Sequence, residues 1–279
     1  MTLDEEIKPI YNGRIEDFKW IGFGSGSGTN LEACAKVRPP AYIFTDKPSA
    51  KLRKLERLVR VPTIVLNGYE ACGSWQKAQG NQDAEAEYQR RSDDFNGRIF
   101  EALKKAEGEM GKPFDLIVLG GYMRLVGKQI LDAYRDRVIN VHPSKLPVRA
   151  NGGKTQRVLV GMNAVYDAII LGNAATASSV ILVDEGVDHG EKIVEGPDVH
   201  VDRKVFSGNN GMREELTRTY ASFHQLLQKM ESDWPAITTA LRFIAEGRVA
   251  LGTMKRHHDE WRKVYIDEKP QGYNGLKLR

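Results

Sequence analysis

Short apolar runs that alternate with helical patterns most constrain what this chain can fold into. The clearest run, FDLIVLGGYM (114–123), is continuous and of strand length, as in strands buried on both faces. Strands and helices in alternation predict an α/β fold, with a doubly wound, mostly parallel sheet and helices on both faces. The other predicted strands are 18–24, 41–46, 61–67, 136–143, 177–184 and 191–202, and the predicted helices are 29–37, 48–59, 93–110, 158–173 and 211–246.

The length and the polarity of certain segments predict the domain organisation. The chain has 279 residues, which suits one large domain with a tail. We expect an N-terminal extension over 1–17, a main domain over 18–251 and a polar, turn-rich tail over 252–279. The polar, Gln-rich stretch 68–92 is interpreted as an insertion, and Ser144 to Lys154 as a loop.

Composition and charge exclude several classes of partner. The 41 basic and 37 acidic residues are interleaved and leave a net charge of +4, which does not favour nucleic acid. No apolar run approaches the roughly 20 residues of a membrane span, and the N-terminus lacks a signal-peptide core. Cys34 and Cys72 have no metal spacing and no disulfide framework, so we expect two small buried or half-buried thiols and no metal. The expected location is the cytoplasm, and the sequence leaves a homodimer open.

A glycine-rich loop, GSGSGTN (24–30), joins the first predicted strand to a predicted helix. Backbone N–H groups at such a helix start can hold an anion, and glycines let a ligand approach closely. The dinucleotide fingerprint fails, because its third glycine falls on Ser27, Thr29 or Leu31, and the ATP-type G-K-[ST] is absent. The loop therefore indicates either a phosphate site or a tight turn without a ligand.

A second group of polar residues, INVHPSKLP (139–147), follows a predicted parallel strand. Ligands of such sheets bind beyond the carboxyl ends of the strands. Asn140 and His142 are two residues apart and so point the same way along an extended strand. They are either a structural pair or an amide donor beside a titratable imidazole.

A third group lies in VDEGVDHGEKI (183–193), where Asp184, Glu185 and Asp188 crowd a glycine-containing loop between two predicted strands. It is either a solvated acidic turn or a carboxylate placed to orient His142. Metal spacing of the zinc type is absent here.

Taken in order, GSGSGTNLEA, DLIVLGGYMRLV, INVHPSKLP, VDEGVDHGEKI, WPAI…FIAEGRVAL and PQGY resemble the glycinamide ribonucleotide (phosphoribosylglycinamide) formyltransferase family, folate-dependent enzymes of purine synthesis. The resemblance runs over most of residues 18–273. It implies a doubly wound α/β fold, with two small-molecule substrates: a phosphorylated ribosyl amine as acceptor and 10-formyltetrahydrofolate as formyl donor.

Site residues follow from the same resemblance, position by position. Asn140, His142 and Asp188 match the catalytic trio, and a cis peptide bond is implied between Leu146 and Pro147. The acceptor phosphate is implied to bind at Gly28, Thr29 and Asn30. The folate pocket is implied to be lined by Met123, Arg124, Leu125, Val126, Asp184, Glu185 and Val187.

Some positions depart from the family pattern. The loop after Pro147 is longer by roughly ten residues and lacks a Thr-His pair, an expected His is Ile181, and His189-Gly190 stands where two glycines are expected. These departures concern the acceptor side. Alternative functions are therefore formyl transfer to another amine such as an amino sugar nucleotide, hydrolysis of formyltetrahydrofolate, and a non-catalytic binding module.

Overall fold

The computed structural model describes residues 5–151, 154–203, 213–258 and 260–279. The chain divides into two compact units. The first unit is Glu16–Ile139, and the second consists of the described residues before Glu16 and after Ile139. Within the described residues, no helix combines the length and the apolar character that crossing a bilayer requires.

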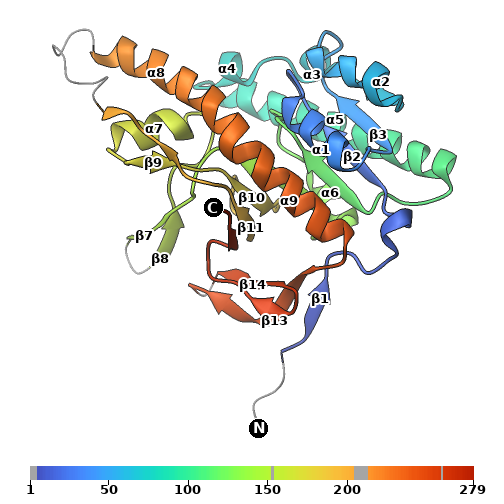
Figure 1. Ribbon diagram of the computed structural model, residues 1–279. Helices are drawn as coiled ribbons and strands as arrows, with labels where there is room; N and C mark the ends of the chain where they lie inside the picture. Colours follow the sequence, from blue (N-terminus) through green and yellow to red (C-terminus); the bar gives the residue numbers. More distant parts are fainter. Residues whose placement is uncertain (1–4, 152–153, 204–212, 259) are drawn as a thin grey trace. The chain divides into compact units, whose positions relative to one another are not determined.

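Four parallel strands in the order β5-β2-β3-β4 form the sheet of the first unit. Two of them, β2 and β3, are labelled in Figure 1. Trp20 pairs with Leu116 and Phe23 with Leu119, so β2 and β5 run in register. The predicted parallel arrangement is confirmed here. The strands are β2 (Trp20–Phe23), β3 (Tyr42–Thr45), β4 (Thr63–Val65) and β5 (Leu116–Leu119).

The helices of this unit follow the strands in sequence. They are α1 (Thr29–Val37), α2 (Lys54–Val59), α3 (Gly68–Cys72), α4 (Trp75–Ala78), α5 (Gln82–Met110) and α6 (Lys128–Ala133), with short 3₁₀ turns at Ile15–Asp17 and Lys51–Arg53.

Aromatic side chains fill the core of the first unit. Trp20, Phe23 and Phe44 are fully buried, and the rings of Phe23 and Phe44 lie 4.6 Å apart. Phe95 and Leu103 on α5 are buried in the same core. Burying one such side chain contributes roughly 1.5–3 kcal/mol, so these side chains stabilise the packing of this unit.

Helix α5 begins eleven residues before its predicted start at residue 93, which the structure corrects. The side chain of Asn81 caps it by accepting a hydrogen bond from the Ala84 N–H, and Gly111, with φ of 69°, ends it. The added turns are polar, but an ion pair between Glu87 and Arg91 at i, i+4 supports them. The stretch 68–92, interpreted as an insertion, therefore contains α3, α4 and the start of α5.

A second set of strands, in the order β16-β11-β10-β6, belongs to the second unit, and β6 (Val138–His142) enters it at Asn140. β10 and β11 are antiparallel neighbours, and β11 and β16 are parallel. The bounds are β10 (Ser179–Leu182), β11 (Lys192–Glu195) and β16 (Leu276–Lys277), and two short strands, β9 (Ala175–Thr176) and β12 (Val199–His200), pair separately. The single strand predicted over 191–202 is thus two strands.

Helices of the second unit form a rod and a separate short helix (Figure 1). The rod consists of α8 (Arg213–Gln228), a π-helical segment (Lys229–Asp233) and α9 (Trp234–Ala245), and the predicted helical stretch is confirmed over these described residues. The short helix α7 (Ala164–Ile170) is narrower than the predicted 158–173.

The predicted polar tail is folded into strands. β13 (Val249–His257) and β14 (Trp261–Ile266) form an antiparallel hairpin, flanked by β1 (Ile7–Pro9) and β15 (Lys269–Pro270). Trp261, Val264 and Tyr265 are buried. The sequence did not predict these strands, because charged residues between the buried side chains make the segment polar overall.

Two expectations about the segment after His142 are wrong. The stretch expected to be a loop contains β7 (Val148–Asn151), which pairs with β8 (Lys154–Arg157). No described peptide bond is cis, so the bond between Leu146 and Pro147 is trans. Leu146 has φ of 48°, and its N–H donates to Ser144 Oγ over 3.0 Å, so a left-handed residue makes the turn instead.

Candidate active site

A buried imidazole and a carboxylate from distant segments meet in the second unit. His142 ends β6 and is 4% exposed, and its Nδ1 lies 3.3 Å from Asp188 Oδ2. The apolar residues of β6 bury the strand, and Pro143 ends it, so His142 stands at the end of the strand. Asp188 lies in the turn between β10 and β11 with φ of 50°. The pair that the resemblance implied is therefore present.

The second nitrogen of His142 is also engaged. Its Nε2 lies 2.8 Å from the carbonyl oxygen of Leu159, and Asp188 Oδ2 accepts a further hydrogen bond from the Gly161 N–H over 2.9 Å. The segment after β8 thus contacts both members of the pair. An imidazole between two acceptors can donate from both nitrogens, which is the arrangement of the charged form.

The pKa of His142 reflects opposing influences. Burial lowers it below its ordinary value, and the Asp188 carboxylate and the Leu159 carbonyl act in the opposite direction. The positive charge of Arg157 adds to the lowering. The net direction is downward, so burial favours the neutral imidazole of His142 and the Asp188 carboxylate offsets this in part.

Asn140, the third member of the expected trio, is half-buried and lies two residues before His142 on β6. Side chains at this spacing leave a strand on the same face. Asn140 and His142 are thus brought to one face at the end of β6, as the sequence predicted.

The glycine loop is built as a helix start in the first unit. Gly28 is the residue before α1 and has φ of 71°, and a Cβ there would lie 2.5 Å from Leu52 Cδ1. Gly26 and Ser27 are exposed, while Asn30 is buried. The loop therefore presents backbone at the positive end of the α1 dipole, a suitable place for an anion.

The residues expected at the folate pocket lie in two segments of the sequence, 123–126 in the first unit and 184–187 in the second. In the first unit, the Met123 N–H donates to Ser25 Oγ over 3.0 Å, which joins the segment 123–126 to the glycine loop. Met123 and Leu125 are 55% and 66% exposed, while Val126 is half-buried. Large exposed apolar side chains at a strand end are a surface that an aromatic ligand can cover.

Arg124 turns away from that surface. Its Nε donates to Asp46 Oδ2 over 2.9 Å and its Nη1 to the Tyr88 hydroxyl over 3.2 Å. The Asp46 side chain is almost fully buried, so this is a buried ion pair. The side chain of Arg124 thus ties the segment 123–126 to Asp46 and Tyr88.

In the second unit the expected folate contacts lie on the turn that carries Asp188. Asp184, Glu185 and Val187 are exposed, and Asp184 Oδ1 accepts from the Gly186 N–H over 2.9 Å. Asp184 Oδ2 lies 2.7 Å from His189 Nδ1, a hydrogen bond that raises the pKa of His189.

Sequence reasoning missed the residues that surround the pair. Arg157, which is 6% exposed, contacts the turn of Asp188. Lys192 is 2% exposed and donates to Glu195 over 2.9 Å and to Asn274 over 2.9 Å, and burial lowers its pKa to about 8. Arg157 lies between a predicted loop and a predicted helix, and Lys192 lies in a predicted strand. No sequence pattern indicates that a Lys or Arg side chain will be buried.

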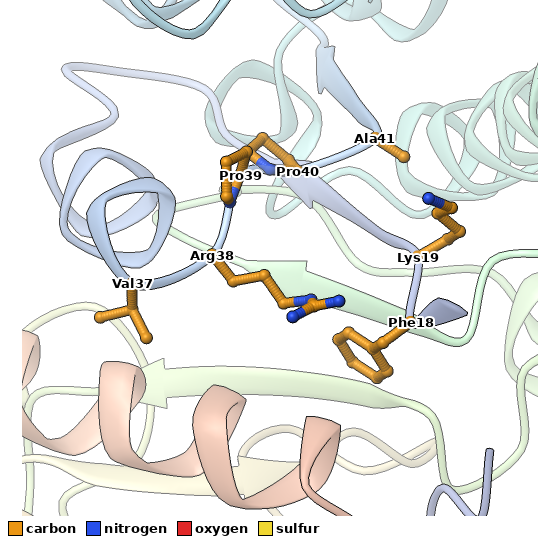
Figure 2. A pocket seen from close by; sticks show the side chains of 7 residues that line it. All are labelled: Phe18, Lys19, Val37, Arg38, Pro39, Pro40 and Ala41. Atoms are coloured by element: carbon orange, nitrogen blue, oxygen red, sulfur yellow. The ribbon is translucent and has the colours of Figure 1, made fainter. Parts of the chain in front are cut away.

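A pocket of about 380 Å³ lies elsewhere in the first unit (Figure 2). Its walls precede β2 and β3, at the amino ends of the parallel strands, whereas the glycine loop follows β2. It is not the ligand edge of this sheet. The lining residues are Phe18, Lys19, Val37, Arg38, Pro39, Pro40 and Ala41.

Comparisons with known proteins agree with the α/β fold described above. A family model described as formyl transferase matches residues 19–204. The phosphoribosylglycinamide formyltransferase of Bacillus subtilis is 30% identical over 184 residues, which are 63% of this chain and 77% of that protein. The chain belongs to the formyl transferase family.

Solved structures show the same fold. The phosphoribosylglycinamide formyltransferase of Coxiella burnetii has a TM-score of 0.60 at 20% identity and covers 94% of this chain and 99% of its own. A formyltetrahydrofolate deformylase of Pseudomonas syringae has a TM-score of 0.53 at 18% identity and covers 90% of this chain and 67% of its own. Both a transferase and a deformylase therefore share this fold.

Proposed function

We propose that this chain transfers the formyl group of 10-formyltetrahydrofolate to the amine of glycinamide ribonucleotide, a step of purine biosynthesis. The observation that carries the proposal is the 3.3 Å contact between His142 Nδ1 and Asp188 Oδ2 in a chain of the formyl transferase family. The curated relative of 30% identity bears this activity in its name.

The chemistry follows from the charge that develops during transfer. The acceptor nitrogen attacks the formyl carbon, a C–N bond forms and the formyl oxygen becomes negative. The Asn140 side-chain N–H and a protonated His142 donate hydrogen bonds to this oxygen. Removing one such donor typically costs about 2.7–4 kcal/mol of transition-state stabilisation.

Collapse of the intermediate completes the reaction. The bond from the formyl carbon to N10 of the folate breaks, and the proton that the acceptor amine loses goes to N10. Asp188 holds His142 in orientation and favours its charged form. The formyl oxygen takes the place that the Leu159 carbonyl has at His142 Nε2, 2.8 Å away in the resting chain.

The remaining residues receive binding roles. Gly28, Thr29 and Asn30 at the start of α1 hold the acceptor phosphate, which the helix dipole and the exposed neighbours Gly26 and Ser27 favour. Folate contacts are assigned within each unit separately: in the first unit to Met123, Arg124, Leu125 and Val126, and in the second to Asp184, Glu185 and Val187.

A folate-absorbance assay tests the proposal. The chain is incubated with 10-formyltetrahydrofolate and glycinamide ribonucleotide, with amino sugar nucleotides, and without acceptor. We expect absorbance change with glycinamide ribonucleotide and formation of its formylated product by mass spectrometry.

The other arms decide between the alternatives. Turnover without acceptor, with release of formate, would identify a hydrolase. Turnover only with an amino sugar nucleotide would reassign the acceptor, and inactivity in every arm with measurable folate binding would identify a binding module.

A further inference from the structure

The turn that carries Asp188 is held by one buried arginine from β8. Arg157 Nη1 lies 2.8 Å from the carbonyl oxygen of Asp188, 2.7 Å from that of His189 and 2.7 Å from that of Gly190. Three successive carbonyl oxygens that converge on one point repel each other unless a donor lies between them. Arg157 supplies that donor.

The conformation of the turn needs such support. Asp188 has φ of 50°, in the left-handed region, where a residue with a side chain persists only if its surroundings hold it. The side chain of Asp188 leaves this turn toward His142. A change in the backbone of Asp188 therefore moves its carboxylate relative to the imidazole.

Two aromatic residues of the C-terminal segment, Trp261 and Tyr273, hold Arg157 in place. Its Nε donates to the Tyr273 hydroxyl over 2.7 Å, and its guanidinium carbon lies 4.7 Å from the centre of the Trp261 ring and 5.4 Å from that of Tyr273. The Trp261 indole N–H also donates to the carbonyl of His189. Cation–π contacts hold a buried guanidinium more firmly than an exposed one, because water does not compete for its charge.

Tyr273 joins this assembly to the segment after His142. Its hydroxyl donates to the Leu146 carbonyl over 2.9 Å while it accepts from Arg157. One side chain from the C-terminal segment thus contacts the turn after β6 and, through Arg157, the turn that carries Asp188. The two segments that supply the His142–Asp188 pair share a common anchor.

We propose that Arg157, held by Tyr273 and Trp261, is a positioning residue that fixes the Asp188 turn and so the contact between Asp188 and His142. This inference rests on the proposed function only where turnover is the readout. Arg157 itself contacts backbone carbonyls and aromatic rings, so it acts on the reaction through Asp188.

The test is a double-mutant cycle read by NMR titration of His142, without any substrate. In the wild-type chain Asp188→Asn should lower the His142 pKa, because the carboxylate charge favours the protonated imidazole. In the Arg157→Met chain the same substitution should lower it by less than half as much. Equal shifts in both backgrounds would overturn the proposal, because charge effects of Arg157 alone are additive and cancel in the cycle.

Turnover supplies a second readout. Arg157→Met should lower kcat about 10–100-fold with KM for both substrates within about twofold, because misplacement by about 1 Å can cost about 100-fold. The matched control is Arg218→Met, which removes an exposed arginine paired with Glu214 on α8. This control should leave kcat unchanged. A loss confined to KM would contradict a positioning role.

A milder variant keeps the test valid if Arg157→Met does not fold. Tyr273→Phe keeps the ring but removes the hydroxyl that joins Arg157 to Leu146. It should lower kcat several-fold and reduce the effect of Asp188→Asn on the His142 pKa. Wild-type values of both would overturn the proposal. An inactive wild-type chain with intact NMR coupling would instead defeat only the proposed function.

Discussion

The start of α1 yields a prediction in which two glycines of one loop respond oppositely to the same change. Gly28 has φ of 71° and its added Cβ would lie 2.5 Å from Leu52 Cδ1 and 3.1 Å from Leu52 Cα. Gly26, two residues earlier, has no heavy atom within 4 Å of an added Cβ and no positive φ. Gly28→Ala and Gly26→Ala are therefore a matched pair.

The magnitude follows from two contributions at Gly28. Placing a residue with a Cβ in the left-handed region costs about 1–2 kcal/mol. Leu52 is fully buried and cannot swing away, so the overlap adds about 1–3 kcal/mol as in other overpacked cores. The free energy of unfolding should fall by about 2–5 kcal/mol. Gly26→Ala should leave it unchanged or raise it by up to about 1 kcal/mol.

Urea denaturation followed by circular dichroism measures both variants against the wild-type chain. A second measurement is the KM for the phosphorylated acceptor, which Gly28→Ala should raise because the backbone at the start of α1 shifts. If Gly28→Ala loses less than about 1 kcal/mol, or no more than Gly26→Ala does, the reasoning about the loop is refuted.

Three further predictions concern the site and the core. His142→Ala should lower kcat about 100–1000-fold with an unchanged circular dichroism spectrum, and a loss below tenfold in the folate-absorbance assay would exclude His142 as the oxyanion donor. Burial lowers the pKa of His142 and of His224, so the unfolded state binds more protons than the folded state as the pH falls through about 6.5. The urea midpoint should therefore decrease as the pH is lowered from about 7.5 to about 5.5, and it should decrease less steeply in His224→Gln. A urea midpoint that does not change with pH would contradict this. Burial raises the pKa of Glu107, but hydrogen bonds from Lys104 and the Tyr134 hydroxyl outweigh it and lower the pKa overall. Glu107→Ala should reduce the free energy of unfolding by about 2–6 kcal/mol, because it leaves the Phe114 N–H and the Tyr134 hydroxyl without their acceptor. The control Glu214→Ala, at an exposed position, should change the free energy of unfolding by less than about 0.5 kcal/mol. Thermal melts of both variants measure the difference.

Elements with strong local patterns could be predicted from the sequence, and elements that depend on distant contacts could not. The apolar run 114–123 contains β5, whose four residues are all buried. A continuous apolar run of this length is typical of a strand covered on both faces. The tail could not be predicted, because the burial of Trp261 and Tyr265 depends on partners far away in the chain. The polar start of α5 was missed for a different reason, since its cap and ion pairs outweigh its low apolar content.

The candidate site divides in the same way. The sequence by itself determined the α/β class, the helix start at the glycine loop and the shared face of Asn140 and His142, because periodicity and backbone preference act locally. Only the tertiary structure decided that Asp188 contacts His142 and that Arg157 is buried against three carbonyls. These contacts join residues from 31 to 46 positions apart, and no local pattern encodes a distance across the fold.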